Sequence, residues 1–166
     1  MLKRISVLVT TSALLLTGCS SSSDEASPSP TVGAGSVSVQ VSGAYGSEPE
    51  VTITPGDPVT ELQVTELVPG SGDGLTAEST LTANYVGYGA ATGQMFDASW
   101  LRGEPATFPL AGVILGWQEG LVGMQVGARR LLVIPAELGY GDNPPPGSGI
   151  EPGETLIFVV DLVSFE

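Results

Sequence analysis

Residues 155–165 read Thr-Leu-Ile-Phe-Val-Val-Asp-Leu-Val-Ser-Phe, the most regular apolar pattern in the chain. In an extended strand, successive side chains point to opposite faces. Both faces of this segment are apolar, formed by Leu156, Phe158, Val160 and Leu162 on one side and by Ile157, Val159 and Val163 on the other. The pattern predicts a strand in the centre of the protein that is covered on both faces.

Five further segments have the periodicity of strands. They are residues 37–42, 51–54, 62–67, 80–86 and 129–134. Turns rich in glycine, proline and aspartate separate the first three of them. Residues 69–74 are polar and glycine-rich, and we expect them to form a loop.

One segment, residues 113–121, has helical periodicity. Its apolar stripe consists of Val113, Ile114, Trp117 and Leu121. Gly123 follows as a stop signal. Several strands and one short helix predict an α+β fold in which an antiparallel β-sheet wraps around one short helix.

The first nineteen residues have the features of an export signal. Lys3 and Arg4 precede an apolar run, residues 5–16, which is shorter than the roughly 20 residues of a membrane-spanning helix. Leu16-Thr17-Gly18-Cys19 resembles the bacterial lipobox, and Cys19 is the one cysteine of the chain. We therefore expect residues 1–18 to be a lipoprotein signal peptide and Cys19 to carry the lipid. A plain secretory signal followed by an incidental cysteine is the alternative.

The rest of the chain divides into three parts by composition. Residues 19–36 are rich in Ser, Pro and Gly and are expected to be a flexible tether after the lipidated cysteine. Residues 37–68 form an N-terminal β segment that packs on the following domain or leads into it. Residues 69–166 hold the remaining strands and the helix.

The composition excludes several classes of function. The formal charge is −13 with five Lys and Arg residues in total, so the chain lacks the basic patch that binding of nucleic acid requires. The absence of histidine excludes a Ser-His-Asp triad, and with a single cysteine it argues against most zinc sites and against a disulfide framework. We expect no metal and no cofactor. Catalysis would have to use carboxylates, phenols, backbone groups or an apolar pocket.

An ordered series of motifs occupies the second half of the chain. The motifs are Asn84-Tyr85-Val86-Gly87, Gln94-Met95-Phe96-Asp97-Ala98-Ser99, Arg102-Gly103-Glu104-Pro105, Val113-Ile114-Leu115-Gly116-Trp117-Gln118-Glu119-Gly120-Leu121, Met124-Gln125-Val126-Gly127, Leu138-Gly139-Tyr140-Gly141 and Thr155-Leu156-Ile157-Phe158. Each motif alone is weak, but their order and spacing together are specific. In these features the chain resembles the FKBP-type peptidyl-prolyl cis-trans isomerases, and the resemblance implies that residues 69–166 are the isomerase domain.

The resemblance implies a proline-binding pocket with Trp117 as its floor. The implied catalytic residues are Tyr85, Phe96, Asp97, Trp117, Tyr140 and Phe158. The implied substrate-binding residues are Arg102, Phe108, Val113, Ile114 and Ile150. Asp97 and Tyr140 would be the polar groups beside the substrate carbonyls, and Arg102 would pair with Asp97 and Tyr85. Without the resemblance, the apolar members would be read as core residues, the tyrosines as half-buried surface residues and Arg102 as a surface charge.

The reaction that the resemblance implies suits this composition. Rotation about an X-Pro peptide bond makes and breaks no covalent bond, so it needs no nucleophile, acid or metal. We expect a monomeric isomerase that acts on proline-containing exported polypeptides, is anchored by lipid to the outer face of the bacterial cytoplasmic membrane, and binds macrolide inhibitors. Two alternatives stay open: a chaperone or scaffold that binds proline segments with little turnover, and a surface lipoprotein whose residues 37–58 recognise a partner.

Overall fold

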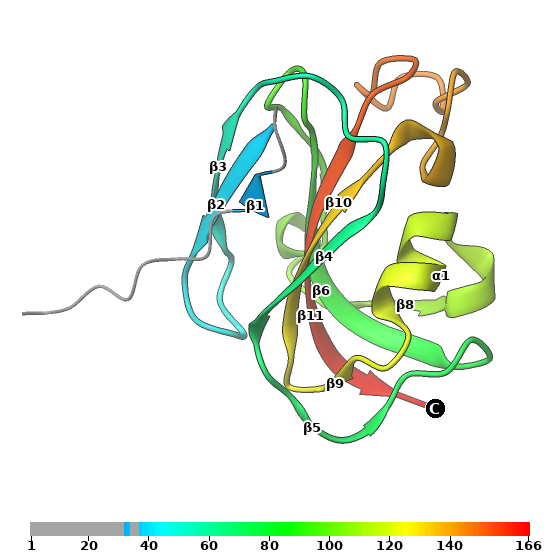
Figure 1. The fold of residues 1–166 in the computed structure, drawn as a ribbon. Coiled ribbons are helices and arrows are strands. Elements are labelled where there is room, and N and C mark those ends of the chain that lie inside the picture. Colours follow the sequence, from blue (N-terminus) through cyan, green and yellow to red (C-terminus); the bar gives the residue numbers. More distant parts are fainter. Residues whose placement is uncertain (1–31, 34–36) are drawn as a thin grey trace, which may run out of the picture.

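The computed structural model describes residues 32–33 and 37–166. Its largest element is a six-stranded antiparallel sheet with the order β4-β10-β11-β6-β7, in which β8 also pairs with β6 (Figure 1). The strands are β4 (Gln63–Val68), β6 (Thr80–Gly89), β7 (Met95–Ala98), β8 (Ala106–Pro109), β10 (Arg129–Ile134) and β11 (Leu156–Phe165). As the apolar pattern predicts, β11 lies in the interior of this sheet, between β10 and β6.

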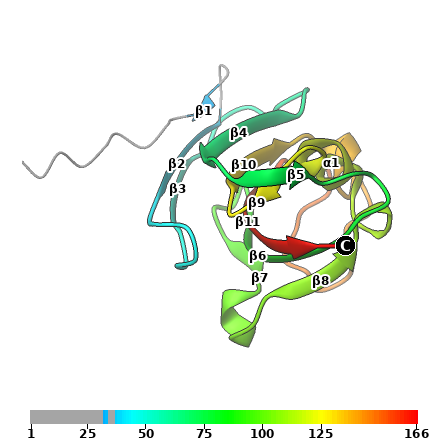
Figure 2. The same cartoon turned by 90° about the horizontal axis from the view of Figure 1, so that it is seen from below.

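One face of the sheet holds α1 (Leu115–Leu121), the single α-helix of the described residues, and forms the larger core with it (Figure 2). The helix approaches β10 closely at two glycines. A Cβ atom at Gly116 would lie 2.4 Å from Ile134, and one at Gly120 would lie 2.8 Å from Leu132. Only glycine therefore allows the short helix to sit directly on the strand. In the described part of the chain, three 3₁₀ helices flank the sheet and the helix: η1 (Trp100–Arg102), η2 (Leu110–Gly112) and η3 (Ala136–Leu138).

A second, three-stranded sheet covers the opposite face of the large sheet (Figure 1). It consists of β1 (Val32–Gly33), β2 (Ser38–Ser42) and β3 (Glu50–Thr54) in that order. Val39 and Val41 are buried against Leu131, Val133 and other side chains of the large sheet. The polar residues that alternate with them face outward, which explains the period of two in this part of the sequence.

A buried ion pair joins the two sheets. The Arg129 guanidinium donates to both carboxylate oxygens of Asp161, at 2.5 and 2.8 Å, and to the backbone carbonyls of Gly43 and Ser47 in the turn between β2 and β3. The backbone N–H of Gly46 donates to Asp161 at 2.8 Å. This turn therefore satisfies polar groups of the large sheet that no solvent reaches.

The structure corrects three details of the sequence-based expectations. The helix begins at Leu115 rather than Val113, because Val113 and Ile114 are extended after η2. Residues 69–74 are not all loop, since β5 (Ser71–Gly74) pairs with β9 (Gln125–Val126). Val163 is 37% exposed rather than buried, because a register shift after Leu162 ends the regular alternation of β11.

No helix in residues 32–33 and 37–166 has the length and apolar character that a membrane span requires.

Candidate active site

A cavity of about 310 Å³ opens between α1 and the large sheet. Its lining is mostly aromatic and aliphatic: Tyr85, Phe96, Asp97, Phe108, Gly112, Val113, Ile114, Trp117, Tyr140 and Phe158. Nine of these ten residues are among the eleven that the resemblance implies for the pocket. The tenth is Gly112, whose side chain is a hydrogen atom and which gave no signal in the sequence.

Aromatic rings form the floor and hold one another in place. Trp117 is 4% exposed, and its ring lies edge-on to Phe158, Tyr85 and Phe108 at centroid distances of 5.3, 5.4 and 6.0 Å. Phe96 meets Phe158 edge-on at 5.5 Å. Such pairs add about 0.5–1.5 kcal/mol each beyond burial of their area. The floor is therefore a rigid apolar surface rather than a set of independent side chains.

Three polar side chains form a closed triangle at one wall of the cavity. The Tyr85 hydroxyl donates to Asp97 at 2.5 Å, Arg102 donates to the other oxygen of Asp97 at 2.7 Å, and Arg102 also donates to the Tyr85 hydroxyl oxygen at 2.7 Å. The guanidinium carbon lies 5.5 Å from the centroid of the Tyr85 ring. Arg102 thus pairs with both residues, as the resemblance implies.

The contacts within the triangle shift the pKa values of Tyr85 and Asp97. Burial raises the pKa of Tyr85 to about 12, and its hydrogen bond to Asp97 contributes in the same direction. Burial would raise the pKa of Asp97, but the hydrogen bonds from Tyr85 and Arg102 outweigh it and lower that pKa below its ordinary value. Burial and the nearby Asp97 charge raise the pKa of Tyr140. At neutral pH the site therefore holds a carboxylate beside protonated phenols.

Two implied pocket residues lie outside the lining. Arg102 is on the outer side of Asp97, where 45% of its side chain is exposed, so it acts on the cavity through Asp97 and Tyr85. Ile150 is partly buried and packs against the core that surrounds the cavity. Trp117 has a further property that the sequence does not reveal: its indole N–H is buried and has no hydrogen-bond partner within the described residues.

The arrangement provides an apolar chamber with a few polar groups at its wall. Within residues 32–33 and 37–166, no group of three or more His, Cys, Asp or Glu side chains could hold a metal ion. The indole N–H of Trp117 has no acceptor in the described chain, and Tyr140 brings a second donor, its hydroxyl, to the cavity lining. Such a site can bury an apolar group and donate a hydrogen bond to a carbonyl oxygen beside it.

Comparisons with known proteins agree with this architecture. The family model of the FKBP-type peptidyl-prolyl cis-trans isomerases matches residues 72–163. An FK506-binding protein of Streptomyces anulatus is 48% identical over 119 residues, which cover 70% of this chain and 96% of that protein. A probable FK506-binding protein of Corynebacterium glutamicum is 42% identical over 118 residues, which cover 70% of this chain and 98% of that one.

Solved structures show the same likeness. FkpA from Escherichia coli superposes with a TM-score of 0.59 and 41% identity over 64% of this chain, but over only 49% of its own length. A peptidyl-prolyl cis-trans isomerase from Pseudomonas syringae pv. tomato gives a TM-score of 0.58 at 33% identity, over 66% of this chain and 78% of that one. The chain belongs to the FKBP family of peptidyl-prolyl cis-trans isomerases.

Proposed function

We propose that this isomerase accelerates rotation about X-Pro bonds in exported polypeptides at the outer face of a bacterial cytoplasmic membrane, where a lipid on Cys19 holds it. The observation that carries the catalytic part is the aromatic cavity bordered by the triangle of Tyr85, Asp97 and Arg102. The location rests on the lipobox-like Leu16-Thr17-Gly18-Cys19, which lies outside the described residues.

The apolar floor supplies the main catalytic effect. Resonance gives the peptide C–N bond a rotational barrier of about 18–20 kcal/mol, and uncatalysed X-Pro exchange takes tens to hundreds of seconds. In the twisted transition state this resonance is lost and the carbonyl is less polarised. Water stabilises the polar planar amide, whereas the rings of Trp117, Phe96 and Phe158 do not. Transfer of the prolyl bond onto this floor therefore favours the twisted state over both planar ones.

The polar groups orient the substrate. Both carboxylate oxygens of Asp97 already accept hydrogen bonds, so its role is electrostatic: it fixes the Tyr85 ring and places a negative charge at one wall. The Tyr140 hydroxyl lines the cavity and keeps its proton at neutral pH, so it can donate to a substrate carbonyl. We assign Tyr140 the task of holding the peptide in register over Trp117.

The orientation of the fold suits a membrane-anchored enzyme. The chain enters the described structure at β1 and β2, which cover the face of the large sheet opposite α1 (Figure 1). The cavity lies on the α1 side. The expected tether of residues 19–36 is interrupted by Val32 and Gly33, which pair with β2 as strand β1. The residues that precede β1 would therefore join the domain behind the cavity, and proline segments would reach the cavity from the side away from the anchor.

Isomerisation of a short X-Pro peptide tests the catalytic proposal. The protein should be a soluble form beginning at residue 20, which retains every residue that the structure describes. We expect acceleration that Phe96→Ala reduces at least tenfold and that a macrolide abolishes. A folded wild-type protein that binds proline peptides without accelerating their isomerisation would instead support a chaperone or scaffold.

Metabolic labelling with palmitate tests the location. We expect label in the membrane fraction for the full-length chain and none for Cys19→Ala. Label that persists in Cys19→Ala, or an unlabelled wild-type protein released into the medium, would contradict the lipid anchor.

A further inference from the structure

Glu154 is a buried acidic residue outside the cavity, with 6% of its surface exposed. Its carboxylate accepts hydrogen bonds from two separate loops. One oxygen accepts from the backbone N–H groups of Ala91 and Thr92, at 3.1 and 3.3 Å, and from the Thr92 hydroxyl at 3.4 Å. The other accepts from the backbone N–H of Glu151 at 2.8 Å. Glu154 therefore connects two segments that are about sixty residues apart in the sequence.

The first segment is the turn between β6 and β7. Backbone hydrogen bonds between Gly89 and Gln94 and between Gly93 and Gly89 close this turn. The strand β7 follows immediately and carries Phe96 and Asp97, which form one wall of the cavity. A shift of the turn would move that wall.

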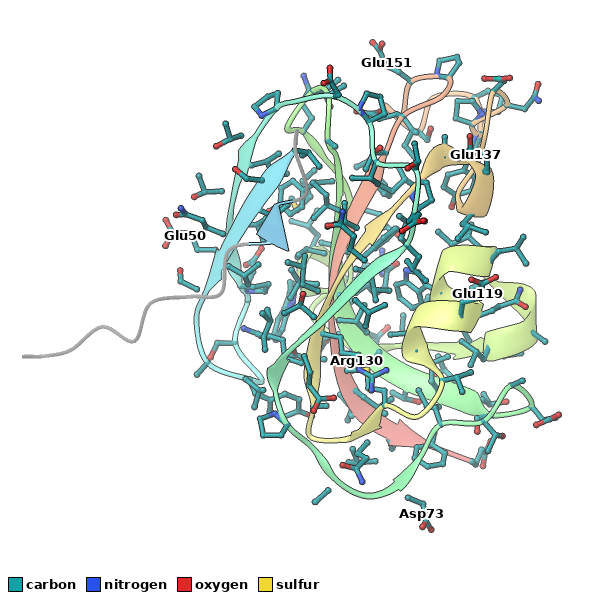
Figure 3. All side chains as sticks on the ribbon, viewed as in Figure 1. Glu50, Asp73, Glu119, Arg130, Glu137 and Glu151 are labelled. Carbon is teal, nitrogen blue, oxygen red and sulfur yellow. The ribbon has the colours of Figure 1, made fainter. Side chains whose placement is uncertain are left out.

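The second segment is the loop of residues 142–152, which has no regular secondary structure and contains three consecutive prolines. Its base is closed by a hydrogen bond from the backbone N–H of Gly153 to the carbonyl of Gly141 at 2.9 Å. Tyr140, which forms another wall of the cavity, directly precedes this base. Glu151 lies on this loop, at the end of the molecule opposite Asp73 (Figure 3).

The Glu154 carboxylate fits between the two loops because residue 89 is glycine and has no side chain. A Cβ atom at Gly89 would lie 2.3 Å from the nearer carboxylate oxygen of Glu154, which is far inside van der Waals contact. A side chain at position 89 would therefore displace the carboxylate from the place where it accepts hydrogen bonds from both loops.

We propose that Glu154 is a positioning residue of the isomerase site, which sets the spacing between the wall of Phe96 and Asp97 and the wall of Tyr140. This role rests on the proposed function of the cavity. Without the carboxylate, the two loops would sample several separations, and only a fraction of the molecules would hold the cavity at the width that fits a prolyl segment. Apparent affinity falls in proportion to the competent fraction.

This argument predicts a particular kinetic signature. KM for an X-Pro peptide and Kd for a macrolide should rise by the same factor, while kcat stays within twofold of the wild-type value. A merely destabilised protein would behave differently: well below its melting temperature the folded fraction stays near one, so KM and Kd would not move. We expect a rise of about tenfold for Glu154→Ala, which corresponds to a competent fraction of about one molecule in ten.

Glu154→Gln provides a second comparison, because glutamine has nearly the same shape as glutamate and lacks its charge. Its single carbonyl oxygen can accept from one loop, while its amide nitrogen, a donor, faces the N–H groups of the other. We therefore expect an intermediate rise of about threefold for Glu154→Gln. Asp73→Asn removes an exposed carboxylate at the far end of the molecule and is the control for charge; it should leave both constants unchanged.

The experiment combines these kinetics with hydrogen exchange at single amides in the full-length chain, purified in detergent. In Glu154→Ala the amides of Ala91, Thr92 and Glu151 should exchange faster than in the wild type. The inference would be overturned by unchanged exchange at these amides, or by faster exchange with KM and Kd within twofold of wild type. A wild-type chain without isomerisation would refute the proposed function instead, and the exchange data would still test the connection of the two loops.

Discussion

Replacement of Arg129 by methionine should lower the free energy of unfolding far more than replacement of an exposed charged residue. The Arg129 side chain is 1% exposed and that of Asp161 is 3% exposed, so solvent cannot take the place of either partner. Methionine fills much of the arginine volume but donates no hydrogen bond. Asp161 would keep only the N–H of Gly46, and the carbonyls of Gly43 and Ser47 would lose their donor.

The magnitude follows from this loss. Removal of one partner of a buried ion pair typically costs about 3–5 kcal/mol, because the remaining charge is buried without compensation. The whole free energy of unfolding of a domain is about 5–15 kcal/mol. At about 2–4 °C per kcal/mol for a chain of this size, the melting temperature of Arg129→Met should fall by about 6–20 °C.

Thermal and urea unfolding followed by circular dichroism would measure the effect. The double variant Arg129→Met with Asp161→Leu should recover part of the loss, since no unpaired charge remains. Arg130→Met is the comparison variant: its partner Glu66 is 43% exposed and the pair is 3.3 Å apart. Arg130 also donates to the carbonyls of Gly120 and Val122. Its loss should cost about 1–2 kcal/mol, less than the loss of Arg129, because no charge is left buried without a partner. A loss below 1 kcal/mol in Arg129→Met, or a double variant that is no more stable than it, would refute the reasoning.

Three further predictions concern the site and the N-terminal sheet. Tyr140→Phe should lower kcat/KM about twofold to fivefold in the X-Pro peptide assay and leave the melting temperature unchanged, because it loses only one hydroxyl of the cavity lining and keeps the ring. The pKa of Asp97 is lowered in the folded protein, so its contribution to stability is complete above the unfolded pKa of about 3.9 and is lost only as the pH falls through the lower folded pKa. Isomerisation rates at pH 5 and pH 7 should therefore agree. A loss of activity already at pH 5 would contradict the assignment. A chain that lacks residues 1–58 should unfold or aggregate, because the valines of the large sheet would be exposed to solvent. Circular dichroism and gel filtration would measure this. A folded, active fragment would show that residues 37–58 are dispensable.

The parts of the fold that could be predicted from the sequence are those with a strong local pattern. The strand β11 is predictable because its apolar residues alternate on both faces, and each face has its own core to fill. The strand β5 is not, because Ser71-Gly72-Asp73-Gly74 has a low intrinsic preference for strands and is extended only through its partner β9. The start of α1 is blurred for a related reason: Val113 and Ile114 fit the helical spacing but line the cavity as an extended segment.

The residues of the candidate site likewise fall into those with a local sequence pattern and those without one. Most of its aromatic members are implied by the ordered motifs of residues 84–158, each of which is a short local pattern. Glu154 has no such signal, because an acidic residue between glycine and threonine in a proline-rich loop is ordinarily exposed. Its burial arises from contacts with Ala91 and Thr92, about sixty residues away, and from the missing side chain at Gly89. Pairings across such distances depend on the folded topology and not on any local pattern.

The central strand also explains why the N-terminal sheet and the cavity are not independent. On β11, Phe158 faces the cavity while Ile157 and Val159, its neighbours in sequence, face the valines of β2. The same strand carries Asp161, which binds the turn between β2 and β3 through Arg129. A displacement of the N-terminal sheet would therefore reach the aromatic floor through a single backbone segment. This coupling is the reason why removal of residues 1–58 is expected to unfold the domain.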